Sequence, residues 1–201
     1  MIAVIDYDAG NIRSVEHALA ALGLEAVVTR DAELIRKADK VILPGVGAFG
    51  DAMEKLNAFG LTEVIREAVA AGKPFLGICL GMQLMFDESE ESAGVKGLSL
   101  LPGRILRIPE GNGLKIPHIG WNDLTFLKEG KLFAGIAQNS YVYFVHSYYL
   151  SAKEPEVVAA TAEYGVTIHA AVEHGNLFGC QFHPEKSGDV GMQILRNFGN
   201  L

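Results

Sequence analysis

Cys79 has the residue type and the neighbours of a catalytic nucleophile. It lies where a short apolar run, Lys73 to Ile78, meets a helix-like run, Leu80 to Phe86, with no loop between them. Gly77 and Gly81 flank it and remove the side chains that would clash at so abrupt a corner. This is the spacing of the Gly-x-Ser-x-Gly elbow with sulfur in place of oxygen. We expect a sulfur aimed at solvent, with the helix start favouring the thiolate; the alternative is a buried, inert cysteine.

A glycine-rich loop, Pro44-Gly-Val-Gly-Ala-Phe-Gly50, follows the third expected strand. Such a loop can expose backbone N–H groups to an anion, although it can also bind nothing. No Gly-Lys-Ser/Thr follows, so the loop does not match a phosphate-binding P-loop. Beside an elbow nucleophile it is better interpreted as an oxyanion hole, with one donor at Leu80 N–H and the other around Val46 and Gly47.

His183 is the best of six histidines for the base that a thiol nucleophile needs. It follows an expected strand at 177–182, and Pro184 fixes the chain as it leaves that strand. Glu185 lies two residues further on, where a carboxylate can orient the imidazole. Cys79, His183 and Glu185 therefore supply nucleophile, base and orienting residue. A metal site is disfavoured, since neither Cys-x-x-Cys nor His-Glu-x-x-His occurs.

The first half of the chain alternates strand and helix patterns, which predicts a parallel sheet covered on both faces. The binding edge of such a sheet is at the carboxyl ends of its strands, where Cys79 and the loop after Leu43 both lie. Strands are expected at 2–6, 24–29, 40–43 and 73–78, and helices at 11–22, 31–38, 50–58, 61–71 and 80–86.

The second half has strand patterns separated by short turns, which predicts antiparallel hairpins added to the parallel core. Strands are expected at 103–108, 119–126, 141–150, 157–163, 167–174 and 177–182, and a last helix at 188–198. No linker-like stretch divides the two halves, so residues 1–201 are predicted to form one domain.

Composition limits the kinds of partner and the cell compartment that are compatible with this sequence. The net charge of −7 argues against nucleic acid as an electrostatic partner. No apolar stretch is long enough to span a bilayer, and no basic segment precedes the first apolar run, which disfavours a signal peptide. Two cysteines, 79 and 180, make no disulfide framework. These features predict a cytoplasmic protein.

Three motifs, in this order, carry a family resemblance: Pro44-Gly-Val-Gly47, Gly77-Ile-Cys-Leu-Gly-Met-Gln83 and Gln181-Phe-His-Pro-Glu185. Together they resemble the class I (triad-type) glutamine amidotransferases over nearly the whole chain. The resemblance implies a three-layer, flavodoxin-like α/β fold and a glutaminase without a cofactor. Cys79 would attack the glutamine carboxamide, His183 would protonate the leaving ammonia, and Glu185 would hold His183.

The resemblance assigns further residues to a glutamine pocket. Gln83 and Glu91 match residues that hold the substrate, with Glu91 facing its α-amino group. The backbone from Tyr143 through Phe144 to Val145 matches the wall of the same pocket. By pattern alone, the acidic run that ends at Glu91 could equally be a solvated helix end.

The resemblance also implies a partner chain. Pro117-His-Ile-Gly-Trp-Asn122 is similar to a segment of the glutaminase subunits of imidazole glycerol phosphate synthases, which act in histidine biosynthesis. Such a subunit forms a heterodimer with a cyclase subunit and passes ammonia to it. Trp121, Asn122, Tyr143 and Lys186 match residues at that interface, near the ammonia exit. The two aromatic residues could instead belong to the core, and Lys186 could be an ordinary surface residue.

Three other functions remain open at this point. The chain could serve another synthase as its glutaminase subunit. It could be a stand-alone cysteine hydrolase, either a peptidase or a γ-glutamyl hydrolase, which would act without a partner on substrates larger than glutamine. It could also be a catalytically silent binding subunit, in which replacement of Cys79 would change nothing.

Overall fold

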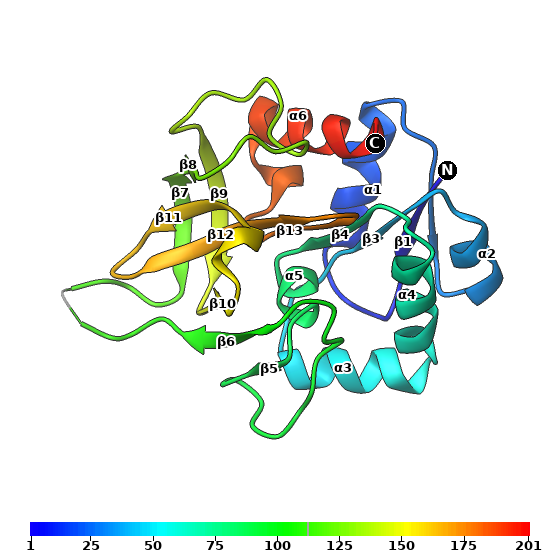
Figure 1. The fold of residues 1–201 in the computed structure, drawn as a ribbon, viewed down its shortest axis with the longest axis horizontal. Helices are drawn as coiled ribbons and strands as arrows, with labels where there is room; N and C mark the ends of the chain where they lie inside the picture. The colour runs from blue at the N-terminus through cyan, green and yellow to red at the C-terminus, as the bar shows by residue number, and fades with distance from the viewer. Residues whose placement is uncertain (112) are drawn as a thin grey trace.

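The computed structural model describes residues 1–111 and 113–201, and Figure 1 shows their α/β architecture. The first half contains β1 (Ile2–Ile5), α1 (Ile12–Ala21), β2 (Ala26–Thr29), α2 (Ala32–Lys37), β3 (Lys40–Leu43), α3 (Phe49–Ala58), α4 (Leu61–Ala70), β4 (Phe75–Ile78) and α5 (Leu80–Leu84). The second half contains β5 (Glu88–Ser89), β6 (Gly103–Arg107), β7 (His118–Asp123), β8 (Thr125–Phe126), β9 (Tyr141–His146), β10 (Tyr148–Ala152), the 3-10 helix η1 (Pro155–Val157), β11 (Val158–Glu163), β12 (Thr167–His174), β13 (Leu177–Cys180), the 3-10 helix η2 (Pro184–Lys186) and α6 (Gly188–Gly199).

The central sheet has eight strands in the order β2-β1-β3-β4-β13-β12-β11-β8. The strands from β2 to β13 run parallel, and β12, β11 and β8 continue the sheet in antiparallel pairs. The predicted parallel sheet with antiparallel additions in the C-terminal half is therefore confirmed. No helix of the described residues is both long and apolar enough to span a membrane.

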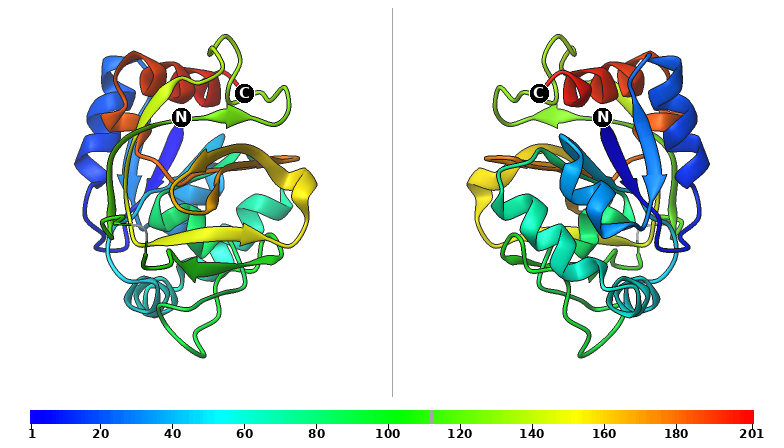
Figure 2. Two further views of the ribbon diagram at one scale, coloured as in Figure 1. Left: turned by 90° about the vertical axis from the view of Figure 1, so that its left-hand side faces the viewer. Right: turned by 90° about the vertical axis from the view of Figure 1, so that its right-hand side faces the viewer.

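Two apolar layers cover the two faces of this sheet, because alternate strand residues point to opposite sides. On one face, α1, α6 and the β7–β9 sheet pack on residues such as Val4 and Ile42. On the other face, α2 to α5 and the β5–β6–β10 sheet pack on residues such as Ile5 and Leu43. Figure 2 shows this layering from both ends of the molecule. The predicted three-layer arrangement is therefore confirmed.

Two of the expected strands each prove to be two strands in different sheets. The run at 119–126 divides at the buried Leu124: β7 pairs with β9 in a separate two-stranded sheet, whereas β8 joins the edge of the central sheet. The run at 141–150 divides at Ser147, because β9 pairs with β7 and β10 pairs with β6. No Gly or Pro lies at Leu124 or at Ser147, so neither division carries a Gly or Pro turn signal in the sequence.

Parallel pairing of β4 with β13 brings together the two motifs that contain Cys79 and His183. Its register places Ile78 opposite Cys180, at the carboxyl ends of both strands. The Cys79 N–H then donates to the Cys180 carbonyl oxygen at 2.7 Å. Cys79 and His183, 104 positions apart in the chain (183 − 79), therefore leave the sheet at the same edge.

The corner between β4 and α5 tolerates only glycine on either side of Cys79. A Cβ on Gly77 would lie 2.7 Å from the backbone nitrogen of Met82. A Cβ on Gly81 would overlap the carbonyl oxygen of Leu43, at the end of β3. Both obstacles are backbone atoms, which cannot move aside without displacing a strand or the helix. The two glycines therefore allow α5 to start directly against the sheet.

Gly81→Ala is expected to lower the free energy of unfolding by about 3 kcal/mol, because overpacking against backbone forces the sheet apart. The measurement is a urea unfolding curve. Gly50→Ala is the matched control, since its new Cβ meets the movable hydroxyl of Ser92 at 2.8 Å. Equal unfolding midpoints for the two variants would show that the corner is not tightly packed.

Candidate active site

Cys79 occupies a strained backbone conformation at the corner. Its φ of 54° and ψ of −110° lie outside the regions that most residues adopt. Backbone hydrogen bonds hold it from both sides: its N–H donates to Cys180, and its carbonyl oxygen accepts from Met82 and Gln83. Strain of this kind persists only where the surrounding structure enforces it, and it gathers at functional sites.

The Cys79 sulfur is not aimed at open solvent, and that expectation was wrong. Cys79 is only 6% exposed. Two neighbours cover the sulfur: the Gln181 side-chain amide, whose Nε2 lies 3.6 Å from Sγ, and the Val145 carbonyl oxygen at 4.0 Å. Both belong to elements of the second half of the chain, which pack over the corner. The thiol therefore faces an enclosed cleft that a small substrate must enter.

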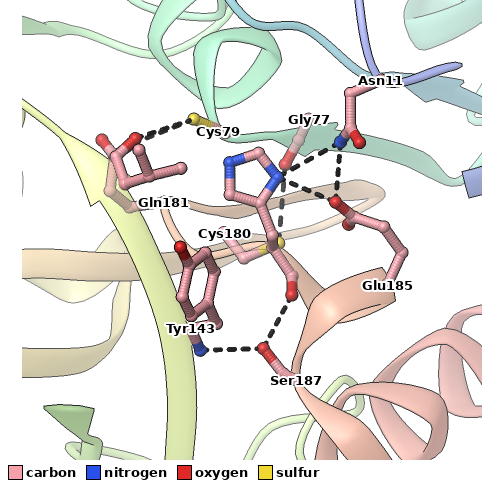
Figure 3. A network of polar contacts seen from close by, with 10 residues as sticks. Asn11, Gly77, Cys79, Tyr143, Cys180, Gln181, Glu185 and Ser187 are labelled. Carbon is pink, nitrogen blue, oxygen red and sulfur yellow. Dashed lines mark hydrogen bonds and ion pairs between the residues drawn. The ribbon is translucent and has the colours of Figure 1, made fainter. Parts of the chain in front are cut away.

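His183 and Glu185 form a buried pair at the end of β13. His183 Nδ1 lies 2.8 Å from Glu185 Oε1, and neither side chain is exposed. The backbone around the imidazole is fixed, since His183 N–H donates to the Tyr143 carbonyl and the Ser187 hydroxyl donates to the His183 carbonyl at 2.7 Å. Figure 3 shows this network beside Cys79.

Burial and neighbouring groups shift the pKa values of His183 and Glu185 in opposite directions, and their balance sets the charges of the pair. Burial alone would lower the pKa of His183, but the adjacent Cys79 and Glu185 outweigh it and raise that pKa to about 9. Burial alone would raise the pKa of Glu185, but hydrogen bonds from His183 and Asn11 hold it below its usual value. At neutral pH the two residues are therefore an imidazolium and a carboxylate.

The second imidazole nitrogen is available for chemistry. His183 Nε2 is buried and has no hydrogen-bond partner among the described residues. Glu185 fixes the proton on Nδ1, so Nε2 is the nitrogen that exchanges protons with a reacting group. An imidazolium beside a cysteine can protonate a leaving amine and then accept a proton from water.

A cleft of about 290 Å³ opens above Cys79. This volume is at the small end of ligand pockets, which span roughly 300–1,000 Å³. A larger cavity of about 640 Å³ lies elsewhere, but the residues that line it, all between 126 and 138, include neither Cys nor His. The small cleft is lined by Val46, Gly47, Cys79, Leu80, Gln83, Glu91, Pro117, Val145, His146, Ser147 and Tyr148.

The cleft brings together most of the residues predicted to hold substrate. Gln83, Glu91 and Val145 line it, whereas Tyr143 and Phe144 are not among its lining residues. Phe144 is fully buried on the opposite face of β9. The Glu91 carboxylate accepts a hydrogen bond from Phe49 N–H, at the start of α3, at 2.7 Å. This bond holds the Glu91 carboxylate at one position in the wall of the cleft.

A buried chain of hydrogen bonds connects the cleft wall to the nucleophile. His118 Nδ1 and His146 Nε2 are 3.0 Å apart, and His146 Nδ1 and Gln83 Nε2 both contact the Tyr148 carbonyl oxygen. Gln83 Nε2 also donates to Gln181 Oε1 at 2.9 Å. Burial lowers the pKa of His118 to about 4 and that of His146 to about 3, so both rings are neutral. These residues hold the wall rigid without adding charge.

The expected oxyanion donors differ in their hydrogen bonding. Val46 and Gly47 border the cleft, and Gly47 has a φ of 113°, which only glycine adopts readily. Leu80 N–H, the other expected donor, donates to the Gly45 carbonyl oxygen at 3.3 Å. This long hydrogen bond competes with any oxyanion for the Leu80 donor.

The four residues predicted at a partner interface lie in the β7–β9 sheet and on η2, which packs against β9. Trp121 and Tyr143 are register partners in β7 and β9, and their rings meet edge to face at 6.0 Å. Trp121 is 56% exposed, which excludes a core role for it. Asn122 is directed elsewhere, since its amide donates to the Glu163 carbonyl. Lys186 is exposed on η2.

Asn11 was missed by the sequence reasoning, although it contacts the His183–Glu185 pair. Its Nδ2 donates to Glu185 Oε1 at 2.7 Å. The available signal was its position: Gly10 and Asn11 follow the first strand, at the same carboxyl edge as Cys79. The sequence reasoning assigned Asn11 only to the start of a helix. In the described parts of the chain, no group of three or more His, Cys, Asp or Glu side chains could hold a metal ion.

The glutamine amidotransferase class-I family model matches residues 3–200. The chain therefore belongs to the class I glutamine amidotransferases. It is 52% identical over 198 residues to the imidazole glycerol phosphate synthase subunit HisH of Methanothermobacter thermautotrophicus, covering 98% of this chain and 97% of that protein. It is 54% identical to the Bacillus cereus subunit of the same name, covering 98% and 93%.

Solved structures share the fold at lower identity. A crystal structure of a glutamine amidotransferase superposes with a TM-score of 0.74 at 21% identity, covering 99% of this chain and all of the other. PurLQS from Thermotoga maritima gives a TM-score of 0.72 at 22% identity, covering 99% and 97%. These likenesses extend the fold assignment well beyond the relatives of similar sequence.

Cys79→Ser is expected to lower the pKa of His183 from about 9 toward its ordinary value, because it removes the sulfur, which is the first of the two neighbours that favour the imidazolium. The measurement is an NMR titration of the His183 ring, with the exposed His17 ring as an internal reference. An unchanged titration in the variant would show that the sulfur does not act on this imidazole.

Proposed function

We propose that this chain is the glutaminase subunit of an imidazole glycerol phosphate synthase. It would hydrolyse glutamine and pass the ammonia to a cyclase subunit. The observation that carries the proposal is the small cleft above Cys79: the strained cysteine and Glu91 line it, and the buried His183–Glu185 pair lies behind the cysteine. The identity of about half of all residues to full-length HisH proteins favours this synthase over others.

The proposed reaction has two steps. Cys79 reacts as a thiolate, its proton being the one on His183 Nε2: the sulfur bonds to the carboxamide carbon of glutamine, His183 gives that proton to the amide nitrogen, and the carbon–nitrogen bond breaks to release ammonia and leave His183 neutral. Water then adds to the glutamyl thioester, gives its proton back to His183, and displaces the sulfur to release glutamate. Glu185 holds the Nδ1 proton and stabilises the imidazolium throughout.

Recognition of glutamine depends on the charge and the amides of the cleft. The Glu91 carboxylate is fixed by Phe49 N–H and suits the α-ammonium group of the substrate. Gln83 borders the same space, and its Nε2 is already bonded to Tyr148 and Gln181, which keeps its side chain in one orientation. A cleft of about 290 Å³ favours glutamine over a peptide, which would need an open groove.

Stabilisation of the oxyanion requires a rearrangement at Leu80. Its N–H must leave the Gly45 carbonyl oxygen, or be shared with the substrate, before it can donate to the oxyanion. Val46 or Gly47 would supply the second donor from the same loop. The free subunit is therefore expected to hydrolyse glutamine slowly, and a partner that moves this loop would activate it.

The outer face of the β7–β9 sheet is the proposed contact with the cyclase subunit. Ile119, Trp121 and Tyr141 are 59%, 56% and 57% exposed, and the strand register places them on one side of the sheet. Large exposed apolar side chains grouped in this way are typical of protein interfaces. Val145 belongs to the same face and also lines the cleft, so ammonia would have a short path from Cys79 to the partner.

Steady-state release of glutamate, measured with and without the liganded cyclase subunit, tests the proposed function. We expect the partner to raise the rate by roughly 100-fold, which is the contribution of one oxyanion donor. Cys79→Ser is the control: it should abolish both the activity and covalent labelling by a glutamine-like electrophile. Equal rates with and without the partner would favour a stand-alone hydrolase, and persistent labelling would place the nucleophile elsewhere.

Trp121→Ala is expected to weaken the affinity for the cyclase subunit roughly 30-fold, or ~2 kcal/mol, because a large exposed aromatic at the centre of an interface is a typical hot spot. Leu127→Ala is the matched control. Leu127 is equally exposed but follows β8, the edge strand of the central sheet, and is not part of the β7–β9 sheet. The measurement is a binding titration by calorimetry. Equal affinities for the two variants would place the interface on another face.

A further inference from the structure

Asn11 directs its side chain into the His183–Glu185 pair and away from its own helix. It precedes α1 at the N-cap position, where an Asn side chain usually accepts hydrogen bonds from the first helical N–H groups. Here it makes no such bond. Its Nδ2 instead lies 2.7 Å from Glu185 Oε1 and 3.3 Å from His183 Nδ1, as Figure 3 shows.

The chemistry of the neighbours fixes the orientation of this amide. The atom that lies 2.7 Å from a carboxylate oxygen must be a donor, because an amide oxygen there would be repelled. With the imidazole proton on Nδ1, the 3.3 Å approach of Nδ2 joins two donors and is a packing contact. The His183 Nδ1–H and one Asn11 Nδ2–H therefore both donate to Glu185 Oε1.

The carboxylate has no other anchor on its side chain. Glu185 Oε2 is buried without a hydrogen-bond partner in residues 1–111 and 113–201. The two side-chain hydrogen bonds to the carboxylate are therefore both to Oε1, one from His183 and one from Asn11. His183 would gain and lose its Nε2 proton during catalysis and so change its charge, whereas the Asn11 amide stays a neutral donor to Glu185 throughout.

The backbone at Asn11 is consistent with this assignment. It has a left-handed conformation, with φ 72° and ψ 0°, which Asn tolerates better than most residues and Gly best of all. Gly10, its neighbour, would bring a Cβ to 2.8 Å from Val46 Cγ2 in the loop beside the cleft. The turn before α1 therefore packs against the cleft loop on one side and against Glu185 on the other.

We propose that Asn11 is a positioning residue of the Cys79–His183–Glu185 site. It holds the Glu185 carboxylate in one orientation, so that His183 keeps its proton on Nδ1 and presents Nε2 to Cys79. The proposal rests on the proposed glutaminase activity for its kinetic test, but the position of the His183 proton is a property of the protein alone.

Asn11→Gly is the decisive variant, because it removes the amide and keeps a residue that accepts the left-handed backbone. We expect kcat for glutamine hydrolysis, with the cyclase subunit present, to fall at least about tenfold with KM little changed, since general acid–base catalysis contributes roughly 10²–10⁴-fold. Asn139→Gly is the matched control: Asn139 has φ 63° and is exposed on the loop before β9.

The pH profile separates positioning from packing. The titratable groups that face Glu185 are His183, from the same segment, and the buried thiol of Cys180, from β13, while Cys79 and the neutral His146 ring face His183. Loss of the Asn11 bond removes an interaction that lowers the pKa of Glu185, so that pKa should rise and the acid limb of kcat/KM should move to higher pH. In Asn11→Asp, a second carboxylate should donate only when protonated, so activity should recover as the pH falls.

The His183 Nδ1–H resonance in NMR spectra gives a readout that needs no substrate. We expect it to shift or broaden in Asn11→Gly and to stay unchanged in Asn139→Gly. Wild-type kcat, pH profile and Nδ1–H resonance in Asn11→Gly would overturn the proposal and leave Asn11 with a backbone role only. If the wild-type complex released no glutamate, the proposed function would fail, and the resonance would still decide the role of Asn11.

Discussion

The parallel pairing of β4 with β13 is the constraint on which the site depends. Its register sets Ile78 opposite Cys180, and the bond from Cys79 N–H to the Cys180 carbonyl extends the pairing by one residue into the corner. A slip of one residue would turn every side chain of β13 to the other face of the sheet. The Gln181 amide would then lose its contact with Cys79 Sγ, and His183 would lie at a different position along the edge of the sheet. The sheet core therefore determines the geometry of the proposed catalytic residues.

Burial makes the remaining polar contacts obligatory. His183 and Glu185 are fully enclosed, and an enclosed charge is stable only if it is paired and hydrogen-bonded. The opposite shifts of the two pKa values, upward for His183 and downward for Glu185, show that pairing outweighs burial for both. Asn11, from the turn before α1, adds a neutral donor to this pair without adding charge.

Local patterns were enough to predict the parallel core and the order of the motifs. A short apolar run that meets a helix-like run without a loop identifies β4, and the close approach of Gly81 to Leu43 explains why glycine is needed at that corner. What the patterns could not reveal depends on contacts between distant segments. The divisions at Leu124 and Ser147 arise because strands change sheets, and Cys79 is covered by Val145 and Gln181, residues far away in the chain.

The placement of Asn11 could not be predicted for the same reason, since its contact with Glu185 spans 174 positions. A Gly-Asn pair before a helix is ordinarily a turn and a cap, and only the fold shows that the amide is directed elsewhere. Sequence patterns therefore identify residues that carry chemistry by their type, such as cysteine and histidine. Residues that act through another side chain become visible only when the strands have been placed side by side.

The enclosure of Cys79 also has a consequence for the proposed function. An open thiol would meet water and other electrophiles, whereas Cys79 faces a small cleft closed by Val145 and Gln181. Val145 of β9 lines that cleft and lies on the same face of the β7–β9 sheet as the exposed aromatic residues. A partner bound to this face would press on the same strand that covers the sulfur. The strand register thus places the proposed site of control directly beside the cleft of the proposed nucleophile.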